Sequence, residues 1–423
     1  MRPCFRAASR VQMCGMSNNR EENAPPLVLR GARVVTPARV IERADVYVED
    51  GRIARISPEE SNTDTRVADA LGASALDLSG LTLYPGFVDV HIHGSVGVDL
   101  MEASAEDLHK VACFLAANGV TTWVPTLVPG PVEEYRRALG AVEELMRSQD
   151  ARTTAARAEG VHYEGPFVNE RQCGALRTEF FRAFDDASKL DELPTLGLEG
   201  AAHMMTLAPE VEGGVKLISE LVARGWVVSM GHTRARVDTL EAATNAGARH
   251  MTHFLNAMSP LHQREPGPIG WGLLRDDVGV DLIADGVHSD PLMLRLVLRC
   301  KTTARVSLIS DAVAPAGLGD GDYKLWGETI RVREGRTSNE RGSIAGSVIT
   351  MLDAARMMNT LGLSEPDVAR VASLNPARLL GLDDRGSIEE GKRADLTALD
   401  DSGQVKLTLV GGRIAHQTQA AEQ

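Results

Sequence analysis

Several features that indicate particular protein classes are absent from this sequence of 423 residues. It has no run of about 18 apolar residues, so a membrane span is not expected. The formal net charge is −13, and a nucleic-acid partner is not expected because phosphate binding needs lysine and arginine clustered on one face. The five cysteines are scattered without CxxC spacing, which is typical of reduced thiols in a cytoplasm and not of a disulfide framework.

The first 26 residues differ in composition from the rest of the chain. They contain several arginines and no acidic residue before Glu21. A targeting segment is one alternative, but no apolar stretch of about 7–15 residues follows the arginines. Met13 or Met16 offers a later start. We therefore expect residues 1–26 to be disordered or wrongly included in the protein.

Composition and length indicate a globular enzyme of two units. Hydrophobic residues make up 43% of the chain and charged residues 24%, which is ordinary for a folded protein. The length exceeds the roughly 100–200 residues of a typical single domain. We therefore expect two structural units, or one barrel with a satellite.

Short alternating strands are expected near both ends of the chain. They are Leu27–Leu29, Arg33–Thr36, Asp45–Glu49, Arg52–Ile56, Leu396–Leu399, Lys406–Val410 and Arg413–Ala415. Turns are expected at Gly31, at Asp50-Gly51 and at Gly411-Gly412, because glycine between alternating runs indicates a hairpin. We predict one small β-sandwich assembled from residues 27–84 and 386–423.

Between these ends, apolar strands alternate with amphipathic helices, which is the pattern of a parallel α/β sheet. The expected strands are Gly86–His91, Thr121–Leu127, Gly160–Tyr163, His203–Leu207, Trp226–Met230, His250–Thr252, Val278–Ala284 and Arg305–Ile309. The expected helices include Ala105–Asn118, Val132–Ser148, Gly214–Arg224, Asp238–Ala246 and Pro291–Cys300. Eight such units predict a closed (β/α)₈ barrel over residues 85–385. An open doubly wound sheet is the alternative, but no GxGxxG follows the first strand.

Metal-binding residue types gather at the carboxyl ends of these strands, where barrel enzymes place their active sites. They are His91, His93, Glu164, His232, His253 and Asp311, and His288 follows the seventh strand. Side chains alternate along a strand, so His91 and His93 project to one face and can share a metal. Imidazole together with carboxylate suits Zn²⁺ or Fe²⁺.

Each of these residues taken alone also has a structural interpretation. A histidine at a strand end is more often a hydrogen-bonded core or rim residue, Asp311 suits a helix N-cap, and Glu164 can satisfy backbone donors. Six ligand-type residues at the same end of five strands favour a functional site. Histidines without other ligand-type residues at the same strand ends are assigned structural roles: His109, His162, His203, His262 and His416.

The local sequence around the candidate ligands is distinctive. The relevant runs are Glu164-Gly165-Pro166-Phe167, Gly231-His232-Thr233, Thr252-His253-Phe254-Leu255-Asn256-Ala257-Met258, Arg264-Glu265-Pro266-Gly267, Asp285-Gly286-Val287-His288, Ser310-Asp311-Ala312, Ser373-Leu374-Asn375-Pro376-Ala377 and Gly391-Lys392-Arg393-Ala394-Asp395-Leu396. His-x-His alone would indicate only the amidohydrolase superfamily. Taken together from Leu27 to Ile414, the runs resemble the N-acetylglucosamine-6-phosphate deacetylases within it.

The resemblance implies a role for each matching residue. Glu164, His232 and His253 hold the main divalent metal, His91 and His93 offer a second metal site, and Asp311 is the catalytic acid and base. Further positions bind a phosphorylated N-acetyl amino sugar: Ala175, Leu176, Asn256, Ala257, Arg264, Asp285, His288, Ile344, Ala345 and Gly346. Arg264 and His288 bind the phosphate of this substrate, in some members of the family across a homodimer interface, and the planar fork of arginine suits phosphate oxygens.

One position departs from the family pattern. The family usually shows Gly-Ala-His where this chain has Gly174-Ala175-Leu176, and that histidine helps to polarise the substrate carbonyl. Leu176 cannot donate a hydrogen bond. Three explanations remain open: a second metal at His91 and His93 acts as the Lewis acid, Arg177 reaches into the site, or the substrate is different.

Two other functions are alternatives. A dihydroorotase-like or N-acyl amino acid hydrolase usually bridges two metals with a carboxylated lysine, but no lysine ends a predicted strand and Glu164 takes the comparable place. A non-catalytic scaffold subunit should lack ligands or Asp311, and none is missing. N-acetylgalactosamine-6-phosphate remains an alternative substrate.

Overall fold

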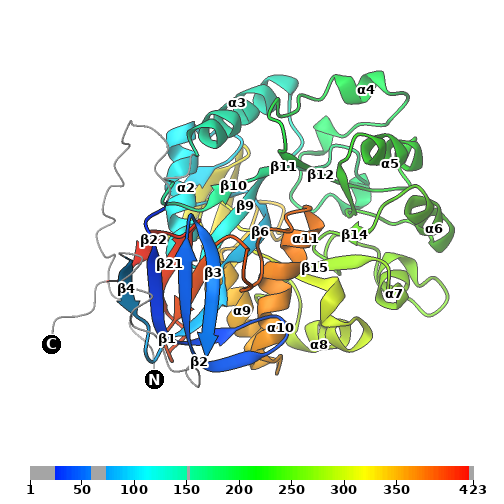
Figure 1. Cartoon of the computed structure of the whole chain (residues 1–423). Coiled ribbons are helices and arrows are strands. Elements are labelled where there is room, and N and C mark those ends of the chain that lie inside the picture. Colours follow the sequence, from blue (N-terminus) through cyan, green and yellow to red (C-terminus); the bar gives the residue numbers. More distant parts are fainter. Residues whose placement is uncertain (1–23, 59–72, 150–152, 419–423) are drawn as a thin grey trace.

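The computed structural model describes residues 24–58, 73–149 and 153–418. These residues form a barrel and a smaller sheet built from both ends of the chain (Figure 1). The expectation of disorder concerned residues 1–26, of which 1–23 lie outside the described residues. In the described part of the chain, no helix is long and apolar enough to cross a bilayer.

Eight parallel strands form the barrel, in chain order. They are β6 (Phe87–Ile92), β9 (Val120–Leu127), β11 (Gly160–Glu164), β12 (Ala202–Leu207), β13 (Val227–Met230), β14 (His250–Met251), β15 (Gly279–Ile283) and β16 (Val306–Ile309), with the short β10 (Arg157–Ala158) ahead of β11. The first strand pairs with β9, and a bridge between Ile92 and Ala312 connects it to the segment after the last strand. The predicted closed barrel is therefore confirmed, and each predicted strand end lies within one residue of the observed end.

Helices cover the outside of the barrel (Figure 1). They are α2 (Ala105–Ala117), α3 (Val132–Ser148), α4 (Ser188–Asp191), α5 (Gly214–Ala223), α6 (Val237–Asn245), α7 (Gly267–Leu274), α8 (Pro291–Cys300), α9 (Met351–Thr360), α10 (Glu365–Ala369) and α11 (Asn375–Leu379). Each longer helix buries one apolar stripe against the strands, as Tyr135, Leu139 and Val142 do in α3.

The two ends of the chain build one mixed sheet with its own core, as expected. Its strands are β1 (Leu27–Val35), β2 (Val40–Glu49), β3 (Arg52–Pro58), β4 (Ser74–Asp77), β5 (Thr82–Pro85), β20 (Leu396–Leu399), β21 (Val405–Val410) and β22 (Arg413–Gln417). The expected turns at Asp50-Gly51 and Gly411-Gly412 are present. The turn predicted at Gly31 is wrong, because the positive φ of this glycine (+67°) forms a bulge inside a single strand, where its N–H donates to Asp45 Oδ1 at 2.9 Å.

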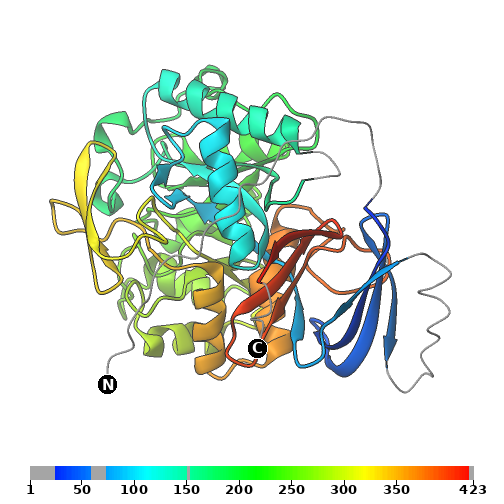
Figure 2. The same ribbon diagram turned by 90° about the vertical axis from the view of Figure 1, so that its left-hand side faces the viewer.

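A three-stranded antiparallel sheet was not predicted from the sequence. It consists of β17 (Gly321–Leu325), β18 (Glu328–Arg333) and β19 (Arg336–Ser338), and it follows the last barrel strand. Trp326 and Gly327 form the turn between its first two strands, both at positive φ. In Figure 2 this sheet is the yellow hairpin on the left, on the side of the barrel away from the terminal sheet.

Candidate active site

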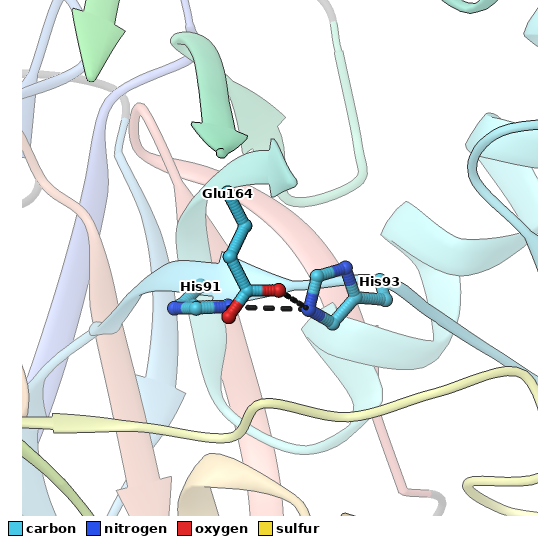
Figure 3. A group of neighbouring side chains, drawn as sticks. All are labelled: His91, His93 and Glu164. Carbon is cyan, nitrogen blue, oxygen red and sulfur yellow. Dashed lines mark hydrogen bonds and ion pairs between the residues drawn. The ribbon is translucent and has the colours of Figure 1, made fainter. Parts of the chain in front are cut away.

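Four imidazoles and one carboxylate meet at the carboxyl end of the barrel strands. The Nε2 atoms of His91 and His93 are 3.1 Å apart, and those of His232 and His253 are also 3.1 Å apart. Glu164 lies between the two pairs: its Oε1 is 2.9 Å from His232 Nε2 and 3.0 Å from His253 Nε2, and its Oε2 is 3.3 Å from His93 Nε2. Figure 3 shows this carboxylate directed at the two histidines of the first strand.

Asp311 closes this cluster on the side of the eighth strand. Its Oδ1 atom is 3.3 Å from His93 Nε2 and 3.4 Å from His91 Nε2. Only 7% of Asp311 is exposed. Burial opposes ionisation, but the imidazoles of His91 and His93 offset it and hold the pKa of Asp311 below its ordinary value. The carboxylate is therefore ionised and within reach of any group bound by the histidines.

The donor atoms of this cluster fit a divalent cation. Two overlapping sets bring their ligand atoms within 4.8 Å of one another: His91, His93 and Glu164, and Glu164, His232 and His253. All five residues are buried. Ring nitrogens that face each other at 3.1 Å repel through their lone pairs unless a proton or a cation lies between them. This mixture of nitrogen and oxygen donors suits Zn²⁺ or Fe²⁺.

Protons compensate the buried carboxylates when no cation is bound. Although burial opposes the charge, Asp311 and Glu164 raise the pKa of His93 to about 10. Burial is likewise offset at His253, where Glu164 raises the pKa to about 9. Burial also opposes the charge of Glu164, but His91 and His232 hold its pKa well below the ordinary value. A metal that binds here replaces protons on these imidazoles.

Strained backbone aims three of these side chains into the barrel mouth. His232, His253 and Asp311 have φ values of +48°, +30° and +49°. This left-handed conformation costs a non-glycine residue roughly 1–2 kcal/mol. Such strain persists only where the surrounding structure enforces it, and it clusters at active sites.

Buried acidic residues hold the strained strand ends in place. Asp281 accepts a hydrogen bond from the His253 backbone N–H and contacts His250 Nε2 at 3.0 Å. Asp89 accepts from Ser310 Oγ at 2.5 Å and from the His91 backbone N–H at 3.3 Å, which connects the first strand to the last. These groups fix the ligands without contacting the cavity.

A further acid, Glu210, connects the loops that follow the third and fifth strands. It accepts from Asn169 Nδ2 at 2.8 Å and from Thr233 Oγ1 at 2.6 Å. Glu210, Asp281 and Asp89 were not predicted from the sequence. Asp89 could have been found, because it precedes His91 by two residues and therefore lies on the same strand face.

A cavity of about 160 Å³, open to solvent, lies over the cluster. Seven of the expected substrate residues line it: Ala175, Leu176, Asn256, Ala257, His288, Ile344 and Gly346. Three residues that were not predicted from the sequence also line it: Gly174, Ile283 and Trp326. The hairpin that carries Trp326 could have been predicted, because alternating strand residues flank its Trp-Gly turn.

Three expected substrate residues do not line the cavity. Arg264 is exposed on the loop that follows β14. Asp285 lies behind His288, whose Nδ1 is 2.6 Å from Asp285 Oδ2. Ala345 is fully buried in an apolar cluster with Val313. Its two neighbours, Ile344 and Gly346, line the cavity instead.

Arg177 also faces away from the cavity. Its Nη2 donates to Glu134 Oε2 at 2.7 Å, and its Nε donates to the Pro129 carbonyl at 3.1 Å. Leu176, by contrast, is only 3% exposed and lines the cavity where the family pattern has histidine. The guanidinium of Arg177 therefore does not replace that histidine in this structure.

Comparison with known proteins agrees with this geometry. The model of the Amidohydrolase family matches residues 82–415. The chain is 36% identical over 403 residues to the N-acetylglucosamine-6-phosphate deacetylase of Bacillus subtilis, covering 95% of this chain and 100% of that protein. It is 34% identical over 390 residues to the N-acetylgalactosamine-6-phosphate deacetylase of Escherichia coli, covering 92% of this chain and 99% of that protein.

A solved structure shows the same likeness in three dimensions. A variant of the N-acetyl-D-glucosamine-6-phosphate deacetylase of Mycobacterium smegmatis, in complex with N-acetyl-D-glucosamine-6-phosphate, superposes with a TM-score of 0.82 at 31% identity. The match covers 92% of this chain and 99% of that chain. The chain belongs to the amidohydrolase family and, within it, to the family of the N-acetylglucosamine-6-phosphate deacetylases.

Proposed function

We propose that this protein is a metal-dependent deacetylase that hydrolyses N-acetylglucosamine-6-phosphate to glucosamine-6-phosphate and acetate. The observation that carries the proposal is the pair of ligand sets that share Glu164, with ionised Asp311 beside them under an open cavity. Relatives with this activity cover nearly the whole chain. The galacto epimer is the second candidate substrate, because the relative that acts on it is almost equally similar.

The metal site follows from the donor set. Glu164, His232 and His253 hold the main ion, and His91 and His93 with Glu164 hold a second ion, so each subunit takes one or two ions. A divalent Zn²⁺ or Fe²⁺ bound there supplies a Lewis acid and lowers the pKa of a water molecule. The protein contributes the fixed orientation of its ligands, which the backbone strain and the buried acids maintain.

Asp311 moves the proton in the proposed reaction. Its low pKa leaves Oδ1 ionised at neutral pH, so it accepts a proton from the attacking water. It then gives this proton to the amine nitrogen, because an amine leaves poorly unless it is protonated. Asp311 is thus base in the first half of the reaction and acid in the second.

The residues proposed to bind the substrate lie around the cavity, beyond the ligand cluster and Asp311. Asn256 and Ala257 contact the sugar, together with Ile344 and Gly346 across the cavity. His288, held by Asp285, binds the phosphate. Binding energy from such a remote group positions the reacting centre.

We further propose that the protein is a homodimer in which the partner's loop completes the phosphate site. Arg264 is exposed and does not line the cavity of its own chain. Exposed leucines lie on the same loop and on the next two helices: Leu261 (49% exposed), Leu274 (81%) and Leu292 (71%). Exposed apolar side chains that gather into one patch are typical of an interface, and we propose that these leucines form such a patch. The thiols of Cys173 and Cys300 form no disulfide, which suits the cytoplasmic location that we propose.

Acetate release tests the proposed function. Purified protein, with and without a chelator, is incubated with N-acetylglucosamine-6-phosphate, its galacto epimer and non-phosphorylated N-acetylglucosamine. We expect rapid chelator-sensitive release from the gluco phosphate and a steep loss of kcat/KM without the phosphate. No release from either phosphate would reject the proposal, and faster release from the galacto epimer would transfer it to that substrate.

A further inference from the structure

Trp326 is the largest side chain that lines the cavity outside the ligand cluster. It lies in the turn between β17 and β18, at a φ of +53°. Its indole ring meets the ring of His93 edge-on, with 5.5 Å between the ring centroids. The hairpin therefore brings a large apolar surface next to one of the proposed metal ligands.

Apolar residues continue this surface along the same side of the cavity. Trp326 and Ala175 both pack on the apolar cluster that includes Val313, Leu325 and Ala345. Leu176, which follows Ala175, is buried and also lines the cavity. We name Trp326, Ala175 and Leu176 the apolar wall.

The polar lining residues come from other parts of the barrel. Asn256 follows the sixth strand and His288 follows the seventh, whereas the apolar wall comes from the loop after the third strand and from the hairpin after the eighth. A sugar phosphate has many hydrogen-bonding groups, so its ring and phosphate match the side with Asn256 and His288. The side chains of the apolar wall offer them no hydrogen bonds apart from the indole N–H of Trp326, which is buried.

The position of the scissile amide follows from the chemistry. Its carbonyl must lie beside Asp311 and the ligand cluster, where water attacks. The acyl substituent is one bond from the carbonyl carbon and points away from the amine that carries the sugar. This substituent therefore meets the side of the cavity that carries Trp326.

We propose that Trp326, together with Leu176, sets the length of the acyl group that the enzyme removes, so that acetyl fits and longer acyl chains are rejected. The inference rests on the proposed deacetylase function and deepens it. It also gives Leu176 a role: the side chain that replaces the family histidine contributes apolar contact at the acyl group. In an apolar pocket, each extra methylene changes kcat/KM by about 10–200-fold.

The test uses the N-acetyl, N-propionyl and N-butyryl forms of glucosamine-6-phosphate, with metal-loaded enzyme. For Trp326→Ala we expect the propionyl-to-acetyl ratio of kcat/KM to rise about 10–200-fold, with butyryl shifting in the same direction, while Trp326→Phe shifts this ratio less. Leu176→Ala, a second variant on the same wall, should raise the ratio as well. Tyr323→Ala is the matched control, because Tyr323 is an aromatic residue of the same hairpin that does not line the cavity and whose hydroxyl donates to Gly319 O; its ratio should equal that of the wild type.

The outcomes separate this inference from the proposed function. If the wild type releases no acetate from N-acetylglucosamine-6-phosphate, the proposed function fails. If the wild type is active but the ratio stays unchanged in folded Trp326 and Leu176 variants, only the role of the apolar wall is overturned. A ratio that rises equally in Tyr323→Ala also overturns it, because the effect then comes from loosening the hairpin.

Discussion

The two ends of the barrel each hold a group of charged side chains, and the two groups differ in how their charges are balanced. At the amino end, Arg385 is 7% exposed and donates to Glu159 Oε1 at 2.7 Å and to Asp384 Oδ1 at 2.9 Å, and it lies 3.9 Å from Asp395 Oδ2. At the carboxyl end, the imidazole nitrogens of the ligand cluster face each other in two pairs, and both pairs contact the carboxylate of Glu164.

How the charges are balanced distinguishes the structural cluster at the amino end from the proposed functional cluster at the carboxyl end. The guanidinium at the amino end has carboxylates as partners within the protein, so that cluster needs no ligand. At the carboxyl end, the facing imidazole nitrogens share a hydrogen only when one ring carries it on Nε2, and a cation between them would satisfy the lone pairs of both rings. A buried polar group that is balanced within the chain stabilises the fold, whereas converging donors of one kind indicate a binding site.

The largest expected effect on activity comes from Asp311. Asp311→Asn preserves the shape of the side chain but removes the proton acceptor, so we expect kcat to fall about 10²–10⁴-fold while substrate binding is retained. Steady-state kinetics, with metal content measured in parallel, provide the check. Activity within about a factor of two of the wild type would contradict the role of Asp311.

A smaller effect is expected where the family histidine is missing. If a second ion at His91 and His93 polarises the substrate carbonyl, His91→Ala or His93→Ala should cost about 10²–10³-fold in kcat, the usual cost of losing one oxyanion donor. Leu176→His should be tolerated and should partly restore activity to such a variant. Full activity of the His91 and His93 double variant with one bound metal would refute this account.

Metal affinity should depend on pH. The pKa values of about 10 at His93 and about 9 at His253 mean that both imidazoles carry protons at neutral pH when no metal is bound. Metal and protons compete, so the affinity should rise with pH, up to about tenfold per pH unit for each proton displaced, until the pH passes these pKa values. Titration calorimetry in buffers of different ionisation enthalpy counts the protons released. Binding without proton release would contradict the assignment.

The smallest effect on catalysis is expected at the amino end of the barrel. Arg385→Ala removes the guanidinium that Glu159, Asp384 and Asp395 share, but Arg157 stays 3.3 Å from Glu159 Oε1 and Arg393 stays 2.9 Å from Asp395 Oδ2. We therefore expect a loss of about 1.5–3 kcal/mol in the free energy of unfolding, the usual worth of a hydrogen bond to a charged group. Urea unfolding measures this loss. The kcat of the folded variant should equal that of the wild type. A large fall in kcat with unchanged stability would contradict the structural role of the amino-end cluster.

Much of the barrel and of its ligand cluster could be predicted from the sequence. Buried parallel strands are short apolar runs, and His91, Glu164 and Asp311 each come at or just after the end of such a run. Parallel strands bring these ends together regardless of the loops between them. The prediction therefore depended on strand boundaries, which the local sequence determines well.

Other features depend on loop geometry, which the local sequence does not determine. The outward path of one loop leaves Arg264 exposed, and the hairpin that carries Trp326 folds back over the site through long-range packing. Gly31 has the positive φ of a turn residue, but tertiary pairing converts that conformation into a bulge. In each case the local sequence indicates a residue's backbone conformation or chemistry. Where its side chain lies is decided by contacts with residues that are distant in sequence.

The most direct test of the central claim compares one glutamate from each end of the barrel. Glu164→Gln and Glu159→Gln each replace a carboxylate in one of the two charged clusters with an amide of similar size. Metal content by elemental analysis and the rise in Tm on adding metal are measured for both variants. We expect Glu164→Gln to lose most of its metal and the rise in Tm, and Glu159→Gln to keep both while unfolding at a lower temperature. Full metal occupancy in Glu164→Gln, or loss of metal in Glu159→Gln, would contradict the assignment of the carboxyl-end cluster as the metal site.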